Sequence, residues 1–234
     1  MPSLCMPDII RKEGQKYAIV RIYLFFPATS GYYGDMGRDK VLHDSMQLVL
    51  TAFDIIDEQG YEHFSARRLA ARMGISHMTV YNYMQRDELL AQVILYGFSL
   101  LNDRIVPHVE ECRKDAESAR RIFLHIAHEL LDFGAAHPNV YRFMFQSNLG
   151  LATEDERIGK MYGRGMEYVR DAIPPDRFEA VREDAFLYLT LVNGLVLGYL
   201  GTRTSSPLEQ FRQRIQRSYE LLLGPTCGKV ALPG

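Results

Sequence analysis

The sequence predicts an all-α protein, because its apolar residues recur at helical spacing and turn residues separate the helical stretches. In the first of these stretches Leu42, Met46, Val49, Phe53 and Ile56 are three or four positions apart, which places them on one helix face. No alternating pattern typical of a strand occurs after the first 40 residues, and no internal repeat is found.

Composition bounds the class of protein. With 47% hydrophobic and 24% charged residues in 234, the chain is expected to be globular rather than disordered. The net charge of -2 gives no overall support to nucleic-acid binding, so any basic surface must be local. The three cysteines have no zinc-ligand spacing, so we expect no structural metal, no cofactor and a reducing, cytoplasmic setting.

Two apolar runs raise the question of a membrane. Residues 17–27 are interrupted by Arg21, and residues 185–200 fall short of the roughly 20 residues that a spanning helix needs. We therefore expect no membrane segment, and we interpret residues 185–200 as a helix buried on all sides.

Residues 1–40 differ from the rest, since they have no helical period and end in the turn-rich stretch 29–37. We interpret them as a flexible N-terminal arm whose excess of basic residues could touch DNA. A second hypothesis is that the natural protein begins at Met36.

Capping residues define two short helices after the first. Gly60 ends the first helix, and Ser65 is a suitable N-cap for a helix over 66–73. Gly74 breaks that helix, and Ser76 caps another that continues to about residue 84.

A long helix is expected over 87–112, with Pro107 as a kink or break. Five more helices are predicted at about 115–136, 138–149, 155–172, 176–203 and 206–223.

The segment 65–90 satisfies the steric requirements of a helix-turn-helix. Ala70 is the small residue needed where two helices cross, and Gly74 permits a positive φ in the turn. Ile75 and Val80 are the apolar residues that would hold the second helix against the first.

Residues 50–90 resemble the DNA-binding domain of the tetracycline-repressor (TetR) family. The matching positions are Gly60, Phe64, Ser65, Leu69, Ala70, Gly74, Ile75, Ser76, Val80, Tyr81, Tyr83, Leu89 and Leu90. Met84 stands where the family usually has Phe, and the following loop is one residue short, so that the family's phosphate-binding lysine falls near Arg86 or on Asp87. Arg86 could supply the phosphate contact. The resemblance implies a helix-turn-helix domain at 41–90, a helical ligand-binding and dimerisation domain at 91–224, and a tail at 225–234.

Local charge supports a role in DNA binding. Between His63 and Arg86 lie four arginines, Arg67, Arg68, Arg72 and Arg86, and no acid. Such a cationic face would contact phosphates, although a solvated helix face is the alternative. The N-terminus of the helix at 66–73, with Ser65 and Arg67, is a further phosphate site.

The helix beginning at Ser76 is the predicted recognition helix. We expect Met78 and Thr79 to contact thymine methyl groups and His77 and Asn82 to bond base edges. Tyr81 and Tyr83 would hold phosphates, while Val80 and Met84 belong to the core.

The second domain is expected to hold a mostly apolar small-molecule effector. Its interior is rich in aromatic residues and methionine, which suits a flat apolar ligand, although plain core packing is the alternative for each residue. The candidate ligand-binding residues are Phe123, His128, Tyr141, Phe145, Met161, Tyr162 and Phe186.

Helices 185–200 and 206–223 are the candidate dimer interface. Gly194 and Gly198 permit close approach of helices, and two helices from each subunit would form a four-helix bundle. On another predicted helix, His125, His128, Glu129 and Asp132 could share one face, which leaves a metal site open, although paired histidines usually make hydrogen bonds only.

The interpretation is a ligand-responsive transcriptional regulator. The resemblance implies a homodimer that binds double-stranded DNA at a palindromic operator, acts as a repressor and is released by its effector. The alternative is an architectural, nucleoid-associated DNA-binding protein without an effector. We expect no enzyme, since the sequence has no phosphate loop, nucleophile elbow or paired catalytic carboxylates.

Overall fold

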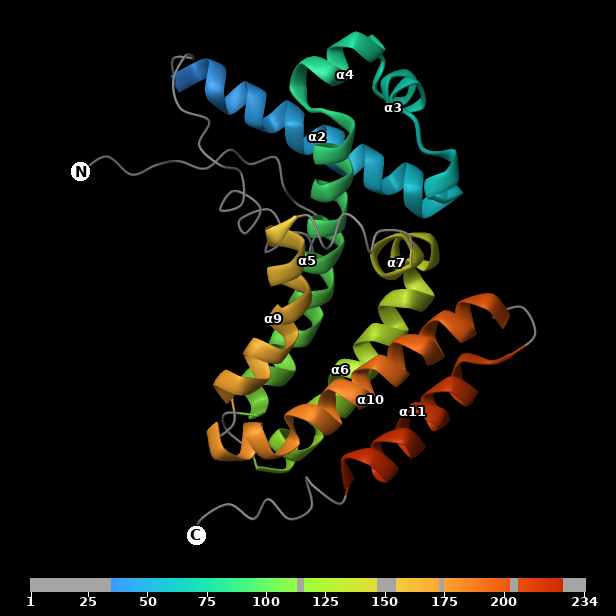
Figure 1. The fold of residues 1–234 in the computed structure, drawn as a ribbon. Helices are drawn as coiled ribbons and strands as arrows, with labels where there is room; N and C mark the ends of the chain where they lie inside the picture. The colour runs from blue at the N-terminus through green and yellow to red at the C-terminus, as the bar shows by residue number, and fades with distance from the viewer. Residues whose placement is uncertain (1–34, 113–115, 147–154, 173–174, 203–205, 225–234) are drawn as a thin grey trace.

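The computed structural model describes residues 35–112, 116–146, 155–172, 175–202 and 206–224. These residues form helices joined by short turns and contain no strand, which confirms the predicted all-α class. Figure 1 shows the first three helices at one end of the molecule and the remaining ones at the other, with a long helix running between them.

At the first end lie α2 (Asp35–Gln59), the 3-10 helix η1 (Tyr61–His63), α3 (Ala66–Met73) and α4 (His77–Tyr83), which we call the head. The connecting helix is α5 (Arg86–Cys112). The remaining helices, which we call the body, are α6 (Ala116–Ala136), α7 (Pro138–Phe145), α9 (Glu156–Ala172), α10 (Pro175–Thr202) and α11 (Leu208–Leu222).

Helix α2 begins earlier than the sequence predicted. The first helix was expected from residue 41, yet the structure starts it at Asp35, inside the stretch assigned to the arm. A glycine within a helix costs only about 1 kcal/mol, so Gly37 does not prevent the extension. The rest of the predicted arm, residues 1–34, lies outside the described residues, as does the tail at 225–234.

Helix α5 continues through Pro107 without the break that the sequence allowed. Proline inside a helix removes one backbone hydrogen bond at a cost of about 3 kcal/mol. Ile105 and Val109 on either side are both buried, so tertiary packing offsets that cost. Helix α7 ends at Phe145 rather than near residue 149.

One hydrophobic core joins the head to the body. Buried residues form a single cluster that extends from Leu48 in α2 to Leu223 at the end of α11. Every residue of α5 from Leu89 to Ser99 is buried. The same helix therefore contributes to the packing of both parts.

Polar contacts also join α2 to α7. The His137 Nδ1 atom lies 2.8 Å from Asp57 Oδ2, and the Asn139 side chain donates a 2.8 Å hydrogen bond to the Asp57 carbonyl oxygen. Nearby, the rings of Tyr61 and Phe143 stack with centroids 4.7 Å apart. The end of α2 and the following turn are thus attached to the body by both polar and aromatic contacts.

Among the residues that the structure describes, two helices are long and apolar enough to cross a membrane by length and composition alone. The segment Arg86–Glu111 of α5 has 78% of its most apolar stretch buried inside the protein, as in the core helix of a soluble protein. In Phe178–Thr202 of α10 the buried share is only 28%. Within the described residues, the apolar run of α10 is covered on one side only, so a single copy of the chain does not bury it on all sides.

Gly134 occupies a position where a side chain has no room. A Cβ atom there would lie 2.6 Å from Val196 Cγ1 and 3.3 Å from the Tyr141 ring, and both neighbours are fully buried. We expect Gly134→Ala to lower the free energy of unfolding by about 1–3 kcal/mol despite the better helix propensity of alanine. Urea denaturation followed by circular dichroism measures the change.

Gly163→Ala is the matched control, because a Cβ atom at that helical glycine meets nothing within 4 Å. It should raise stability by up to about 1 kcal/mol. Equal stability changes in the two variants would contradict the close α6–α10 packing described above.

Candidate DNA-binding surface and ligand cavity

Helix α3 and the turn after it have the geometry of a helix-turn-helix. The Ser65 hydroxyl oxygen accepts a 3.2 Å hydrogen bond from the Arg68 backbone N–H, which caps the helix as predicted. Gly74 ends it at φ +68°, in the left-handed region that favours glycine. The Ile75 N–H then bonds the Ala70 carbonyl at 3.0 Å, so the turn is closed by backbone contacts.

Helix α4 is held by one face and exposed on the other. Ser76 Oγ accepts a 3.1 Å hydrogen bond from the Thr79 N–H and caps the helix. Val80 and Met84 are buried, as predicted. On the free face His77 and Asn82 are exposed, together with Met78 at 59% and Tyr81 at 37% of their surface.

Two predicted contact residues are less accessible. Thr79 is half-buried, and its hydroxyl lies 2.8 Å from the Ser76 hydroxyl. Tyr83 is also half-buried, at the edge of the exposed face where the sequence placed it.

The cationic surface is narrower than the sequence indicated. Arg72 makes two 2.7 Å hydrogen bonds to the carboxylate of Glu58 on α2, which lower the pKa of Glu58 and raise that of Arg72. The fold thus places Glu58 of α2 beside Arg72, although the sequence between His63 and Arg86 contains no acidic residue. Arg68 donates to Gln59 Oε1 and to the His63 carbonyl oxygen.

Arg67 and Arg86 remain at the surface. Arg67 is exposed, and within the described part of the chain its side chain has no ion pair or hydrogen bond. Arg86 donates a 3.1 Å hydrogen bond to the Tyr61 hydroxyl, and its guanidinium carbon lies 5.8 Å from the centre of that ring. Arg86 is thus held in place while its side chain stays about half exposed.

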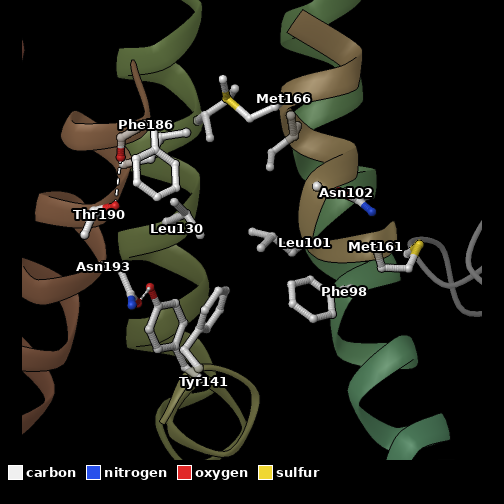
Figure 2. Close-up of a pocket in the computed structure, with 15 residues that line it drawn as sticks. Phe98, Leu101, Asn102, Leu130, Tyr141, Met161, Met166, Phe186, Thr190 and Asn193 are labelled. Carbon is white, nitrogen blue, oxygen red and sulfur yellow. Dashed lines mark hydrogen bonds between the residues drawn. The ribbon is translucent and has the colours of Figure 1, made fainter. Parts of the chain in front are cut away.

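A cavity of about 230 Å³ lies in the body and is bordered by residues of α5, α6, α7, α9 and α10. Figure 2 shows α5 side chains on one side of it and α10 side chains on the other. Most of its wall is apolar. The lining residues are Phe98, Leu101, Asn102, Ile105, Ile126, Leu130, Tyr141, Phe145, Met161, Gly163, Met166, Phe186, Leu189, Thr190 and Asn193.

Four of the predicted ligand residues, Tyr141, Phe145, Met161 and Phe186, line this cavity. Two others do not. Phe123 is fully buried in the core without bordering the cavity, and His128 borders a separate polar hollow beside α11. Helical period placed these two on α6 but could not define which side of α6 borders the cavity. The side chain of Tyr162 lies outside the described residues.

Polar cavity residues were missed by the sequence analysis. The Tyr141 hydroxyl donates a 2.9 Å hydrogen bond to Asn193 Oδ1, and Thr190 donates to the Phe186 carbonyl oxygen at 2.8 Å (Figure 2). Asn102 is only 4% exposed. The sequence feature that could have indicated Asn102 is its position as an asparagine within the apolar run of the long α5 helix.

The four α6 residues considered for a metal have different partners. His125 stacks on His108 of α5, with centroids 4.8 Å apart, and Glu129 Oε1 lies 3.1 Å from His108 Nε2. Asp132 pairs with Arg212 of α11. Burial lowers the pKa of both His125 and His128. Among the residues with described side chains, no group of three or more potential ligands could hold a metal ion.

The outer surface of α10 is strongly apolar. Phe186 and Leu187 are more than half exposed, Leu191 is 43% exposed, and Leu221 of α11 is exposed as well. Figure 1 shows α10 and α11 side by side along the outer edge of the body. Gly194 and Gly201 have open space around them, whereas Gly198 approaches Phe211 of α11.

The sequence matches no protein-family model and no curated protein. Solved structures nevertheless share its fold. A TetR transcriptional regulator from Rhodococcus sp. RHA1 superposes with a TM-score of 0.54 at 19% identity, covering 80% of this chain and 97% of that one. A tetR-family transcriptional regulator from Streptomyces coelicolor gives a TM-score of 0.54 at 15% identity, covering 79% and 82% of the two chains.

A third similar structure is the fatty acid degradation regulator FadR from Bacillus halodurans. Its TM-score is 0.52 at 14% identity, and the match covers 82% of this chain and 97% of that one. The chain therefore has the all-α fold of the TetR-family transcriptional regulators.

Proposed function

We propose that this protein is a cytoplasmic, DNA-binding transcriptional regulator of the TetR family. The main observation behind the proposal is the position of α4. Its Val80 side chain is buried in the core of the head, while His77, Met78 and Asn82 are exposed on the opposite face. A short helix supported in this way can enter the major groove and present its side chains to base edges. The domain division at residues 90 and 91 follows from this assignment.

Phosphate contacts would fix the register of α4 on the duplex. Ser65 caps α3, so the first turn of that helix provides backbone N–H groups and a positive dipole end. Arg67 lies in the same turn and is free to reach a phosphate. Arg86, together with Tyr81 and Tyr83, would contact DNA phosphates near the C-terminal end of α4. Arg68 would act mainly by stabilising the turn before α3, where it bonds the His63 carbonyl oxygen.

Two copies would associate through α10 and α11. The exposed apolar residues of α10 need a protein partner, and four helices from two subunits form a bundle of known packing. A two-fold dimer would place two α4 helices on successive major-groove faces of a palindromic operator.

The cavity would hold the effector, and α5 would connect it to the head. Phe98 and Leu101 on α5 border the cavity, while Leu89 and Leu90 on the same helix belong to the core next to the head. A ligand that prefers a second arrangement of α5 would weaken DNA binding, with a coupling energy of about 1–3 kcal/mol. This is the mechanism of a repressor released by its ligand, and the cavity favours it over an architectural protein without an effector.

Asn82→Ala tests base recognition. Loss of its amide should change the preference at one base pair by about 1–3 kcal/mol, because a base-edge hydrogen bond is removed. Operators selected from random DNA by the wild-type protein, followed by gel shifts on single-base variants, measure this. Selection that recovers no preferred sequence would contradict the proposed operator binding.

Arg67→Ala tests the phosphate contact. It should weaken binding to all sequences about equally and reduce the slope of log affinity against log salt by about one. Gel shifts over a salt series measure both effects. Arg170→Ala is the matched control, since that exposed arginine lies in the last turn of α9, and α9 belongs to the body, away from α4 in Figure 1. An unchanged salt slope in the Arg67 variant would contradict the contact.

Leu187→Glu combined with Leu191→Glu tests the dimer. Two carboxylates in the apolar face of α10 should give monomers in sedimentation experiments and abolish tight operator binding, because unpaired charges are costly to bury. Lys160→Glu, at an exposed position of α9, is the control for added negative charge. A double variant that remains dimeric would place the interface elsewhere.

A further inference from the structure

We infer that the cavity binds an uncharged, mostly apolar ligand whose carbonyl or hydroxyl group is recognised by Asn102. This inference rests on the proposal that the cavity is the effector site, and it specifies the chemical class of the effector. It depends on three features of the cavity. Its described wall has no charged side chain, the buried Asn102 amide has no hydrogen bond among the described residues, and the other polar side chains of the wall bond within the protein.

No charged side chain borders the cavity among the described residues. Charged groups on neighbouring turns have other partners, since Glu129 contacts His108 and the Arg104 guanidinium lies over the Phe133 ring. A carboxylate or an ammonium group in this cavity would therefore lose its water without gaining a counter-charge. Burial of an unpaired charge is strongly unfavourable, so the wall selects against ionised ligands.

Asn102 is buried but its side chain is unpaired. It lies on α5 next to Leu101 and one turn before Ile105, both of which also line the cavity. Its side chain is 4% exposed, and no hydrogen bond of its amide occurs within the part of the chain that the structure describes. Buried polar groups almost always have a partner, so the amide is available to bond whatever occupies the cavity, whether water or a ligand. A side-chain amide both donates and accepts, which suits a carbonyl, amide or hydroxyl group.

The other polar side chains of the wall each make at least one hydrogen bond within the protein. The Thr190 hydroxyl bonds the Phe186 carbonyl oxygen, and the Tyr141 hydroxyl bonds Asn193. The Tyr141–Asn193 pair lies across the cavity from Asn102 in Figure 2. The Asn193 amide nitrogen has no hydrogen bond among the described residues, but Asn193 is only half-buried, so Asn102 is the buried residue of the wall whose whole amide can discriminate between a polar and an apolar ligand.

The cavity volume sets the size of the ligand. About 230 Å³ lies just below the range of roughly 300–1,000 Å³ that is usual for drug-sized ligands. The ligand is therefore compact, with an aromatic or alkyl part against Phe98, Phe145 and Phe186 and one polar group at Asn102.

Matched small molecules test this class directly. The probes are 4-phenylbutanamide, 4-phenylbutanoate, 4-phenylbutylamine and butylbenzene, with octanamide, octanoate and octylamine as a second skeleton. Calorimetry and thermal shifts on the full chain without DNA measure binding. Within each skeleton the amide should bind at least tenfold more tightly than the carboxylate or the amine, and 4-phenylbutanamide should show the same advantage over butylbenzene.

Variants identify the residue responsible. Asn102→Leu keeps the number and branching of the side-chain heavy atoms but removes the amide, and it should remove the advantage of 4-phenylbutanamide over butylbenzene. Asn102→Asp is nearly isosteric and should shift the preference toward 4-phenylbutylamine. Ser99→Ala is the matched control, because Ser99 is another buried polar residue of α5 that does not border the cavity and its hydroxyl already bonds the Tyr96 carbonyl oxygen, so this variant should keep the wild-type preference. Circular dichroism verifies that each variant is folded, and the two Asn102 variants provide independent tests.

Three results would overturn the inference: a carboxylate or amine that binds as tightly as the amide, an Asn102→Leu protein that keeps the preference, or no binding by any probe. The proposed function is tested separately by gel shifts with the tightest probe. Amide-selective binding that leaves DNA affinity unchanged would reject the effector role while supporting the ligand class.

Discussion

The continuous burial of α5 is the constraint on which the rest of the structure depends. From Leu89 to Ser99 the helix has no exposed residue, so head and body share one packed core instead of being joined by a flexible linker. Close-packed interiors rearrange between discrete states and do not deform smoothly. A ligand that displaces Leu101 or Asn102 therefore acts on the helix that also packs against α2 of the head. In the proposed mechanism, the helix that lines the cavity would therefore connect the ligand to the DNA-binding head.

The contacts between α2 and α7 restrict how the head can move. Asp57 is bonded by both His137 and Asn139, and Phe53 lies edge-on to His137 with centroids 5.7 Å apart. With α5 on one side and this junction on the other, the head is attached at two places. A shift of α5 alone would strain or break the Asp57 contacts, because partly buried hydrogen bonds are costly to lose. Head movement should therefore involve α7, which also supplies Tyr141 to the cavity wall.

The sequence predicted those features that depend on local geometry. Ser65, Gly74 and Ser76 act within a few residues of their own position, so their capping and turn roles follow from residue type and spacing. The pairing of Arg72 with Glu58 spans 14 residues and requires the crossing of α3 over α2, which no local pattern specifies. Asn102 was missed for a similar reason. Helix α5 is apolar on nearly all sides, so its period does not show which face borders the cavity.

Helices α5 and α10 are similarly apolar, but α5 is mostly buried within the described residues and α10 is mostly exposed. The difference indicates that the apolar face of α10 has a partner outside this chain. The surroundings of α10 argue against lipid as the missing partner. Its first turns carry Glu179, Arg182 and Glu183, and α11 beside it exposes Arg217 and Glu220. Charged side chains next to an apolar stripe are typical of the rim around a protein interface, whereas a hydrocarbon layer would leave them unsolvated. In the proposed dimer, a second copy of the same face would cover the apolar stripe and leave its charged border in water.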